Sequence, residues 1–328
     1  MSEGSAPDRN ISMELARATE AAALGAAPWT GRGDKNGADG GAVDAMRAML
    51  NTVDMDGVIV IGEGEKDEAP MLFNGEHVGT GSGPQVDVAV DPIDGTTLLS
   101  LGRPNAVSVI AAAPRGTMYN PHDIFYMDKI AVGPDAKGKV DLSAPVSWNL
   151  EQVAKARGIS VPEVTVVILD RPRNETIVAD VRAAGARIVS ITDGDVAGAV
   201  MTGSAGTGVD VLLGIGGSPE GVTAACAMKA LDGDMQCRLW PRHDDDRKLA
   251  VERGLDLAQL LTLDDLVSSD DCFFAATGIT TGYLMRGVEF TSEGARTESL
   301  VMRSRSRTVR TIEAEHHTRK IEQIISVE

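Results

Sequence analysis

The feature that most constrains the fold is a regular alternation of strand-like and helix-like segments between residues 164 and 231. The short apolar runs typical of strands are 164–169, 187–191 and 209–213. The segments with helical spacing lie between and after them, at 176–184, 195–202 and 219–231. This order predicts parallel strands joined by right-handed crossovers, so this half of the chain is expected to be of the α/β class.

The first half has a different rhythm. Apolar residues recur at helical spacing over 10–26 and about 39–53, and short strand-like runs follow at 58–61, 86–90, 106–113 and 124–132. The polar, Gly- and Pro-containing stretch 133–145 is the best boundary. We therefore predict an N-terminal α+β domain over 1–137 and a C-terminal α/β domain over 138–328. The tail after about residue 250 returns to short strands and is a candidate to pack back on the first domain.

Charge and composition exclude several classes of partner. The chain has 31 Lys and Arg against 48 Asp and Glu, a net charge of −17, which disfavours nucleic acid and anionic lipid. The apolar runs are far shorter than the ~18 residues of a membrane span, and the N-terminal sequence lacks the pattern of a signal peptide. Three scattered cysteines, Cys226, Cys237 and Cys272, suit reduced thiols. We expect a cytoplasmic protein with no nucleic-acid or membrane partner.

An acidic turn with the sequence DPIDGTT occupies residues 91–97, directly after the strand-like run 86–90. Asp91 and Asp94 project about one turn apart, and the amides of Gly95, Thr96 and Thr97 open towards the same point. Carboxylates beside free amides can hold a hard divalent cation with a phosphate bound to it. A simple capped turn is the alternative. Two carboxylates beside an apolar strand would repel each other without a cation, which favours the metal interpretation.

Two further acidic turns precede it. Residues 62–68 (GEGEKDE) follow the strand-like run 58–61 and are equally compatible with a solvated loop or a site at the end of a strand. Residues 31–39 (GRGDKNGAD) mix cations with carboxylates before a helix, which suits a phosphate near a metal. The alternative for that segment is a helix cap at Asp39.

In the second half of the chain, a glycine-rich segment and an arginine-rich segment each fit more than one role. Residues 214–221 (GIGGSPEG) resemble a dinucleotide-binding turn and would suit an oxidoreductase, but Pro219 replaces the third glycine and instead fits the start of a helix. Glu220 is then either a residue of the helix cap or a metal ligand. The sequence Arg171-Pro172-Arg173 can grip a phosphate or form surface ion pairs. Residues Arg303, Arg305 and Arg307 alternate, which predicts one strand face at the surface.

The DPIDGT segment resembles the metal signature of the lithium-sensitive phosphatase superfamily, which includes inositol monophosphatases. Together with residues 31–39, 62–72, 193–195, 214–221 and 276–280 (ATGIT), it makes the chain similar to the class II bacterial fructose-1,6-bisphosphatases, in order over about residues 10–313. The resemblance implies an α/β fold, a layered α/β/α/β/α sandwich of the sugar-phosphatase type with two domains. It also implies two or more Mn²⁺ or Mg²⁺ ions per active site and a homotetramer or homodimer. The domain over 1–137 would bind metal, and the domain over 138–328 would bind the sugar phosphate.

The resemblance also implies roles for individual residues. Asp39 and Glu63 would hold one cation, and Asp91, Asp94 and Glu220 the other. The scissile phosphate would contact Asp94, Gly95 and Thr96. The sugar and its distal phosphate would be bound by Tyr126, Arg171, Pro172, Arg173, Asp193, Gly194, Asp195 and Gly217. The residues important for catalysis would be Thr96, Lys35 and Asp67, with Thr96 orienting the attacking water.

The expected reaction is therefore metal-dependent hydrolysis of the 1-phosphate of fructose 1,6-bisphosphate, giving fructose 6-phosphate and inorganic phosphate in gluconeogenesis. The rival substrates are sedoheptulose 1,7-bisphosphate, alone or with the fructose ester, and an inositol monophosphate; a non-catalytic sugar-phosphate sensor is the remaining alternative. The chain departs from the family pattern at 99–104, at Asn174, where a histidine is usual, and at Tyr283, where an acid is commoner. These departures bear on substrate preference more than on the chemistry.

Overall fold

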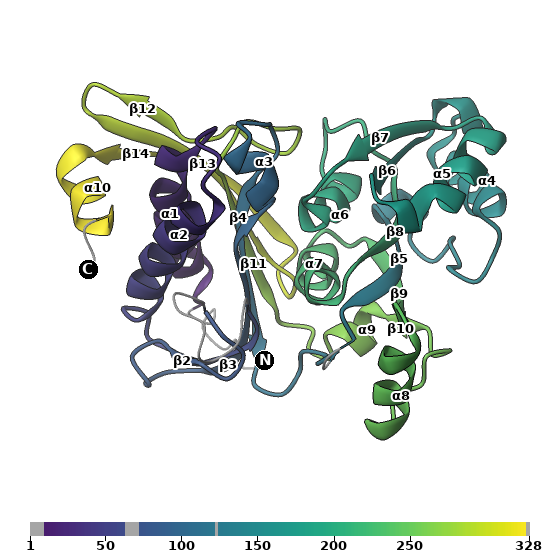
Figure 1. Cartoon of the computed structure of the whole chain (residues 1–328), viewed down its shortest axis with the longest axis horizontal. Coiled ribbons are helices and arrows are strands. Elements are labelled where there is room, and N and C mark those ends of the chain that lie inside the picture. Colours follow the sequence, from purple (N-terminus) through teal and green to yellow (C-terminus); the bar gives the residue numbers. More distant parts are fainter. Residues whose placement is uncertain (1–9, 63–71, 122–123, 326–328) are drawn as a thin grey trace, which may run out of the picture.

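The computed structural model describes residues 10–62, 72–121 and 124–325. Two mixed β-sheets and three layers of helices alternate in the order α/β/α/β/α, with the two sheets visible on either side of the central helices in Figure 1. This arrangement confirms the predicted layered sandwich. In the part of the chain that the structure describes, no helix is long and apolar enough to cross a membrane.

The first sheet has eight strands in the order β12-β13-β11-β4-β3-β1-β2, with β14 paired to β13. Their bounds are β1 Asp56–Ile61, β2 His77–Val78, β3 Gln85–Asp94, β4 Val107–Pro114, β11 Phe273–Gly278, β12 Glu289–Thr291, β13 Gly294–Arg303 and β14 Thr308–His317. β11 pairs antiparallel with β4, so strands that follow residue 250 complete a sheet begun by residues 56–114.

The second sheet has six strands in the order β10-β9-β5-β8-β6-β7. Their bounds are β5 Tyr126–Val132, β6 Thr165–Leu169, β7 Arg187–Ile191, β8 Val211–Gly217, β9 Asp234–Trp240 and β10 Leu261–Thr262. β6 is parallel to both β7 and β8, as predicted, but β5 is antiparallel to β8 and β9. The prediction of parallel strands over residues 164–231 is therefore confirmed. The sheet as a whole is mixed, because a strand from the first half of the chain is inserted antiparallel between β8 and β9.

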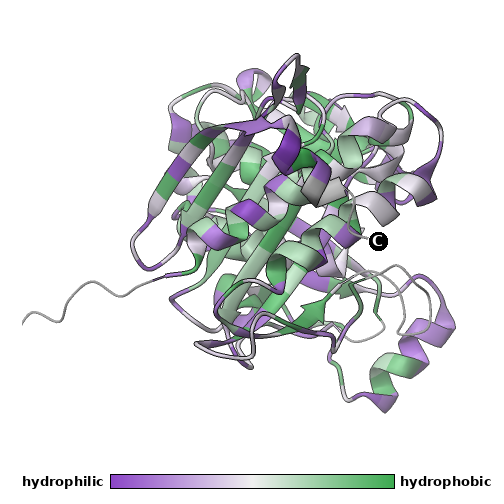
Figure 2. Ribbon diagram, turned by 90° about the vertical axis from the view of Figure 1, so that its left-hand side faces the viewer, coloured by the Kyte–Doolittle hydropathy of each residue, from purple (hydrophilic) through white to green (hydrophobic). Residues whose placement is uncertain are grey.

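The helices form three layers, one between the two sheets and one on the outer face of each sheet. α1 (Ser12–Ala26) and α2 (Lys35–Leu50) cover the outer face of the first sheet, α6 (Asp195–Gly203) and α7 (Ser218–Ala230) form the central layer, and α4 (Val146–Arg157) and α5 (Glu175–Ala184) cover the second sheet. α1 and α2 pack so closely that a Cβ on Gly25 would lie 2.2 Å from the carbonyl oxygen of Gly41. Figure 2 shows the apolar strands behind helices that carry polar residues.

Shorter helical segments complete the chain. They are α3 (Thr96–Ser100), α8 (Asp244–Glu252), α9 (Leu263–Leu266) and α10 (Thr318–Ile325), with 3₁₀ turns at Ala27–Trp29, Pro134–Ala136, Val161–Glu163 and Pro172–Asn174. The chain passes from the first sheet to the second between β4 and β5 and returns to the first sheet between β10 and β11. The domain division at 137/138 stays a prediction.

β8 continues to Gly217 and α7 starts at Ser218, so Pro219 stands at the start of a helix, as predicted. Residues 214–217 are strand, which agrees with the rejection of a dinucleotide-binding turn. The expectation for the three arginines fails. Arg305 and Arg307 lie in the turn after β13, where Arg307 has a φ of 47°, so the three arginines do not share a strand face. Arg303 instead pairs with Asp271 at 2.7 Å.

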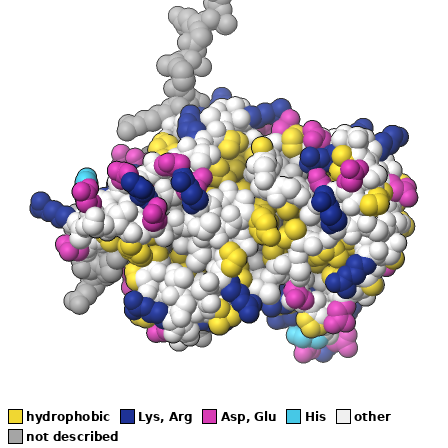
Figure 3. Space-filling model, turned by 90° about the horizontal axis from the view of Figure 1, so that it is seen from above, with side chains coloured by type: hydrophobic (Ala, Val, Ile, Leu, Met, Phe, Trp, Pro, Cys, Tyr) yellow, Lys and Arg dark blue, Asp and Glu magenta, His cyan; other side chains and the backbone are white. Residues whose placement is uncertain are grey.

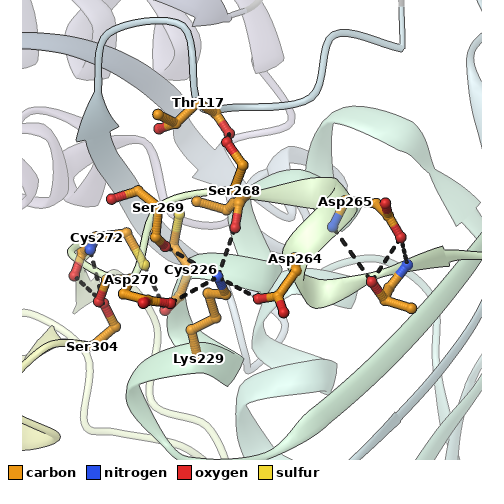
Figure 4. A network of polar contacts seen from close by, with 12 residues as sticks. Thr117, Cys226, Lys229, Asp264, Asp265, Ser268, Ser269, Asp270, Cys272 and Ser304 are labelled. Carbon is orange, nitrogen blue, oxygen red and sulfur yellow. Dashed lines mark hydrogen bonds and ion pairs between the residues drawn. The ribbon is translucent and has the colours of Figure 1, made fainter.

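A buried lysine ties the central layer to the segment through which the chain returns to the first sheet (Figure 4). Lys229, near the end of α7, donates to the carbonyl oxygens of Val267 at 2.7 Å and Ser269 at 3.0 Å, and pairs with Asp264 at 2.8 Å. Its side chain is only 8% exposed. The end of α7 is therefore held against the 267–270 segment that leads into β11.

Candidate active site

Two Asp-Gly turns face each other at the ends of helices from different layers. Asp94-Gly95 precedes α3 and Asp193-Gly194 precedes α6; both glycines have left-handed φ values, 102° and 86°. Such a backbone conformation favours glycine because it has no Cβ. Asp94 accepts a hydrogen bond from the backbone amide of Ala197 in α6, at 3.3 Å, and Asp193 accepts one from the amide of Thr97 in α3. Each turn therefore caps the helix that follows the other.

Carboxylates crowd around this junction. Asp94 is 3% exposed, and its pKa is raised well above the usual range, first by burial and then by the carboxylates of Asp195, Glu220 and Asp193. Burial also raises the pKa of Asp193. Like charges at this density are stabilised by a bound cation, which is the role predicted for Asp94 and Glu220.

The first sheet and α2 contribute the other predicted carboxylates. The side chain of Asp91 accepts a hydrogen bond from the amide of Ile93, at 3.0 Å, where the β3–β4 register is irregular. Asp39, on α2, accepts one from Thr96 Oγ1 at 3.0 Å, and burial raises its pKa. The hydroxyl of Thr96 is therefore already hydrogen-bonded to a predicted metal ligand.

The structure brings Lys35 to the same place. Lys35 is the first residue of α2, whose N-cap Asp34 accepts a hydrogen bond from the amide of Gly37. The ammonium of Lys35 donates to Thr97 Oγ1 at 2.8 Å. Glu63 and Asp67 lie outside the described residues, so their predicted roles stay predictions.

One buried lysine in this site was not predicted from the sequence. Lys129, in the middle of β5, has a side chain that is 2% exposed, and its Nζ lies 2.7 Å from Asp195 Oδ2. Burial alone would lower its pKa, but the nearby carboxylates of Asp195 and Glu220 outweigh burial and raise it. Asp195, predicted to contact the sugar, is thus held by an ion pair within the protein.

The residues predicted to bind the distal phosphate lie where β6 and β8 end and β5 begins. The Arg173 guanidinium carbon lies 4.2 Å from the ring centre of Tyr126, and Arg173 Nε donates to the carbonyl oxygen of Ile215 at 2.9 Å. Tyr126 is the register partner of Gly217. Pro172 starts the 3₁₀ turn that carries Arg173. Arg171 lies 4.0 Å from Asp193, which connects this group to the Asp-Gly turns.

The donor set suits a hard divalent cation. Within residues 10–62, 72–121 and 124–325, no three His, Cys, Asp or Glu side chains are gathered as a preformed metal site. The predicted ligands are all carboxylates, which Mg²⁺ and Mn²⁺ prefer. A Cβ on Gly217 would lie 1.8 Å from Glu220 Oε2, so the glycine leaves the space that the carboxylate of Glu220 uses. The residues present therefore fit the predicted metal.

Charges on one face of the molecule are mixed. Figure 3 looks down on the molecule from above and shows Lys and Arg side chains interspersed with Asp and Glu on that face. The protein as a whole carries a charge of −17, so binding of a small anion requires local positive charge.

Comparison with known proteins gives one consistent result. Residues 9–316 match the sequence profile of a family described as "Bacterial fructose-1,6-bisphosphatase, glpX-encoded". The chain is 47% identical over 322 residues to the Escherichia coli K12 protein named fructose-1,6-bisphosphatase 1 class 2, covering 94% of this chain and 96% of the relative. The same identity and coverage are found with a Shigella flexneri protein named fructose-1,6-bisphosphatase class 2.

Proposed function

The chain belongs to the family of bacterial fructose-1,6-bisphosphatases, and on that premise we propose how its own residues carry out the reaction. It is a phosphoric monoester hydrolase of class II that converts fructose 1,6-bisphosphate to fructose 6-phosphate and inorganic phosphate in gluconeogenesis. Enzymes of this family are metal-dependent. The proposal concerns which residues hold the metals, the two phosphates and the attacking water.

Carboxylates at the ends of strands and helices would hold the cations, which we propose to be Mn²⁺ or Mg²⁺. Asp39 and Glu63 would hold one, and Asp91, Asp94 and Glu220 the other. When bound, such ions supply positive charge against the phosphoryl group and make water more acidic. The observation that supports this most strongly is the burial of Asp94 beside three other carboxylates, which leaves a strong excess of negative charge to be offset.

The scissile phosphate would lie at the Asp94-Gly95-Thr96 turn. The left-handed Gly95 allows the chain to turn sharply there. Thr96 Oγ1, now donating to Asp39, would orient the attacking water, with Lys35 stabilising negative charge and Asp67 assisting the proton transfer. The hydroxyl–carboxylate pair is the feature that makes Thr96 the best candidate for positioning water.

Recognition of the rest of the substrate would fall to the second sheet. Arg171, Pro172 and Arg173 would receive the distal phosphate, and Tyr126, Gly217 and the turn of Asp193, Gly194 and Asp195 would receive the sugar. Among the described residues, the terminal Nη atoms of Arg173 have no hydrogen-bonded partner, while Nε is already bonded to the backbone. A guanidinium held in this way presents a planar donor pair suited to a phosphate.

Phosphate release tests these assignments. We expect fructose 1,6-bisphosphate to be hydrolysed faster than sedoheptulose 1,7-bisphosphate and inositol 1-phosphate, with activity in Mn²⁺ or Mg²⁺ and none in EDTA. Asp94→Asn should abolish turnover while the circular-dichroism spectrum is retained, because an amide binds a hard cation poorly. Full activity of that variant would remove Asp94 from the metal site. A higher kcat/KM for the seven-carbon ester would make sedoheptulose bisphosphate the preferred substrate.

We also propose a homotetramer or homodimer that acts in the cytoplasm. All three cysteines are buried and unlinked, which suits a reducing compartment. β14 pairs with β13 along one edge, and most of its residues are exposed, so a second copy could approach this strand. Light scattering coupled to size-exclusion chromatography would measure the assembly, and a monomer at working concentration would contradict the proposal.

A further inference from the structure

Asn174 fills a gap where two parallel strands separate. The β6–β8 ladder pairs Val166 with Val211 and Val167 with Leu212, and no further pair of this ladder is formed among the described residues. Beyond it, Asn174 Nδ2 donates to the carbonyl oxygens of Leu169 in β6, at 3.0 Å, and Ile215 in β8, at 3.2 Å. The amide of Ile215 donates back to Asn174 Oδ1 at 2.7 Å. One side-chain amide thus replaces the peptide unit that a continuing ladder would have supplied.

The neighbouring backbone is shaped to admit this amide group. Asn174 is fully buried. Gly214, whose φ is 134°, has no side chain, and a Cβ there would lie 3.1 Å from Asn174 Oδ1. A buried amide that makes three hydrogen bonds holds its surroundings in one arrangement, because each lost bond would leave a polar group unpaired away from water.

The carbonyl oxygen of Ile215 also accepts a hydrogen bond from Arg173. Ile215 O accepts from Asn174 Nδ2 and from Arg173 Nε, at 2.9 Å, and the guanidinium lies over the ring of Tyr126. The position of Ile215 therefore sets the position of the guanidinium, and Asn174 sets the position of Ile215 through both its amide and its carbonyl.

We propose that Asn174 is a positioning residue for binding of the distal phosphate: by bridging β6 and β8 it holds Ile215, and through Ile215 the guanidinium of Arg173, in the orientation that receives that phosphate. This inference rests on the proposed role of Arg173. The side chain of Asn174 is fully buried and hydrogen-bonded to backbone groups of β6 and β8, so it acts through Ile215. Its loss should therefore weaken binding of a bisphosphate and leave the hydrolytic step intact.

The test compares KM with kcat. Asn174→Asp keeps the shape and the Oδ1 acceptor but removes the Nδ2 donor, and should raise KM for fructose 1,6-bisphosphate about fivefold or more with kcat within about twofold. Fructose 1-phosphate lacks the distal phosphate, so kcat/KM for it should be unchanged.

A double variant tests whether the two residues act together. Arg173→Ala should raise KM for the bisphosphate by about ten- to hundredfold, and adding Asn174→Asp to it should raise KM no further. If Asn174→Asp does not fold, Asn174→Ala, which buries no charge, takes its place. The expected result is the same: KM rises and kcat stays within about twofold.

Asn149 provides the matched control. It is also buried, at 2% exposure, on α4, where its side chain accepts from the amide of Asp141 at 2.9 Å and donates to the carbonyl of the same residue at 2.8 Å. Asn149→Asp should lower the melting temperature and leave KM unchanged.

Two results would overturn the inference. A lowered melting temperature with unchanged KM in the Asn174 variant, alongside a raised KM in Arg173→Ala, would make Asn174 purely structural. An unchanged KM in Arg173→Ala would overturn the proposed role of Arg173 itself and the inference with it.

Discussion

Removing Lys129 should destabilise the protein far more than removing a surface lysine. The side chains of Lys129 and Asp195 are 2% and 6% exposed and 2.7 Å apart, so Lys129→Met leaves a carboxylate buried without its partner. Breaking a buried pair from one side costs about 3–5 kcal/mol, because the remaining charge keeps its desolvation penalty. The free energy of unfolding should fall by that amount.

A second substitution separates the charge from the packing. In Lys129→Met/Asp195→Asn the buried carboxylate is gone, so a large part of the lost free energy should return. The matched control is Arg17 with Glu14, an ion pair whose side chains are 49% and 43% exposed. Arg17→Met should cost no more than about 1 kcal/mol, since solvent screens an exposed pair.

Urea unfolding in the presence of a chelator, followed by tryptophan fluorescence, measures these differences without a contribution from bound metal. A loss below about 1 kcal/mol for Lys129→Met would refute the reasoning, because it would mean that water or a proton satisfies Asp195 as well as the ammonium does. A double variant as unstable as the single one would show that packing of the lysine chain, rather than charge, stabilises this part of β5.

Three further results are expected. Thr96→Ser should retain measurable activity, whereas Thr96→Ala should lose about 10²-fold or more in kcat with KM little changed; near-normal kcat in a stable Ala variant would remove Thr96 from the mechanism. Exhaustive chelation should abolish turnover, as should Asp91→Asn with the fold intact, and full turnover of the chelated enzyme would contradict the two-metal proposal. Burial, and then Lys320, lower the pKa of His316 to about 4. The unfolded chain therefore binds an extra proton below about pH 6.5, and stability should fall by about 3 kcal/mol between pH 6.5 and 4 in urea titrations. The same loss in His316→Gln would assign it to other groups.

The hydrogen bonds of His316 give that last prediction its sign. Its Nε2 lies 2.9 Å from Thr297 Oγ1, and its Nδ1 lies 3.2 Å from the ammonium of Lys320. A lysine ammonium can only donate, so Nδ1 accepts and the ring is neutral. Protonation would place a charge on a buried imidazole next to the ammonium of Lys320, and acid should therefore destabilise the folded protein.

Local patterns predicted most of the elements correctly. The alternation over residues 164–231 matches β6, α5, β7, α6, β8 and α7. Short continuous apolar runs marked the strands, and β8 is indeed buried along its whole length, whereas the helices were marked by longer segments of helical spacing. The turn at Asp94-Gly95 was also visible, since glycine is needed where φ is positive. Helix α4 was not predicted. Its buried residues, Asn149, Leu150, Val153 and Ala154, recur at helical spacing, but they are four of twelve residues and one of them is polar, so the apolar pattern is weak.

Contacts between distant segments could not be predicted in this way. Nothing in the local sequence of β5 indicates that Lys129 is buried, since a lysine in a strand is ordinarily at the surface. It is buried because β5 is inserted between β8 and β9 and the carboxylate of Asp195, 66 positions away in sequence, meets it there.

The sequence by itself determined the kinds of elements, the acidic Asp-Gly turns and, through their order, the family. The tertiary structure alone decided which turns face each other, which strand stands between β8 and β9, and that Asn174 joins β6 to β8 where their ladder ends. The physical reason is the distance along the chain over which each effect acts. Turn chemistry and side-chain periodicity act over a few residues, whereas the pairing of a buried charge or amide depends on how separate layers pack.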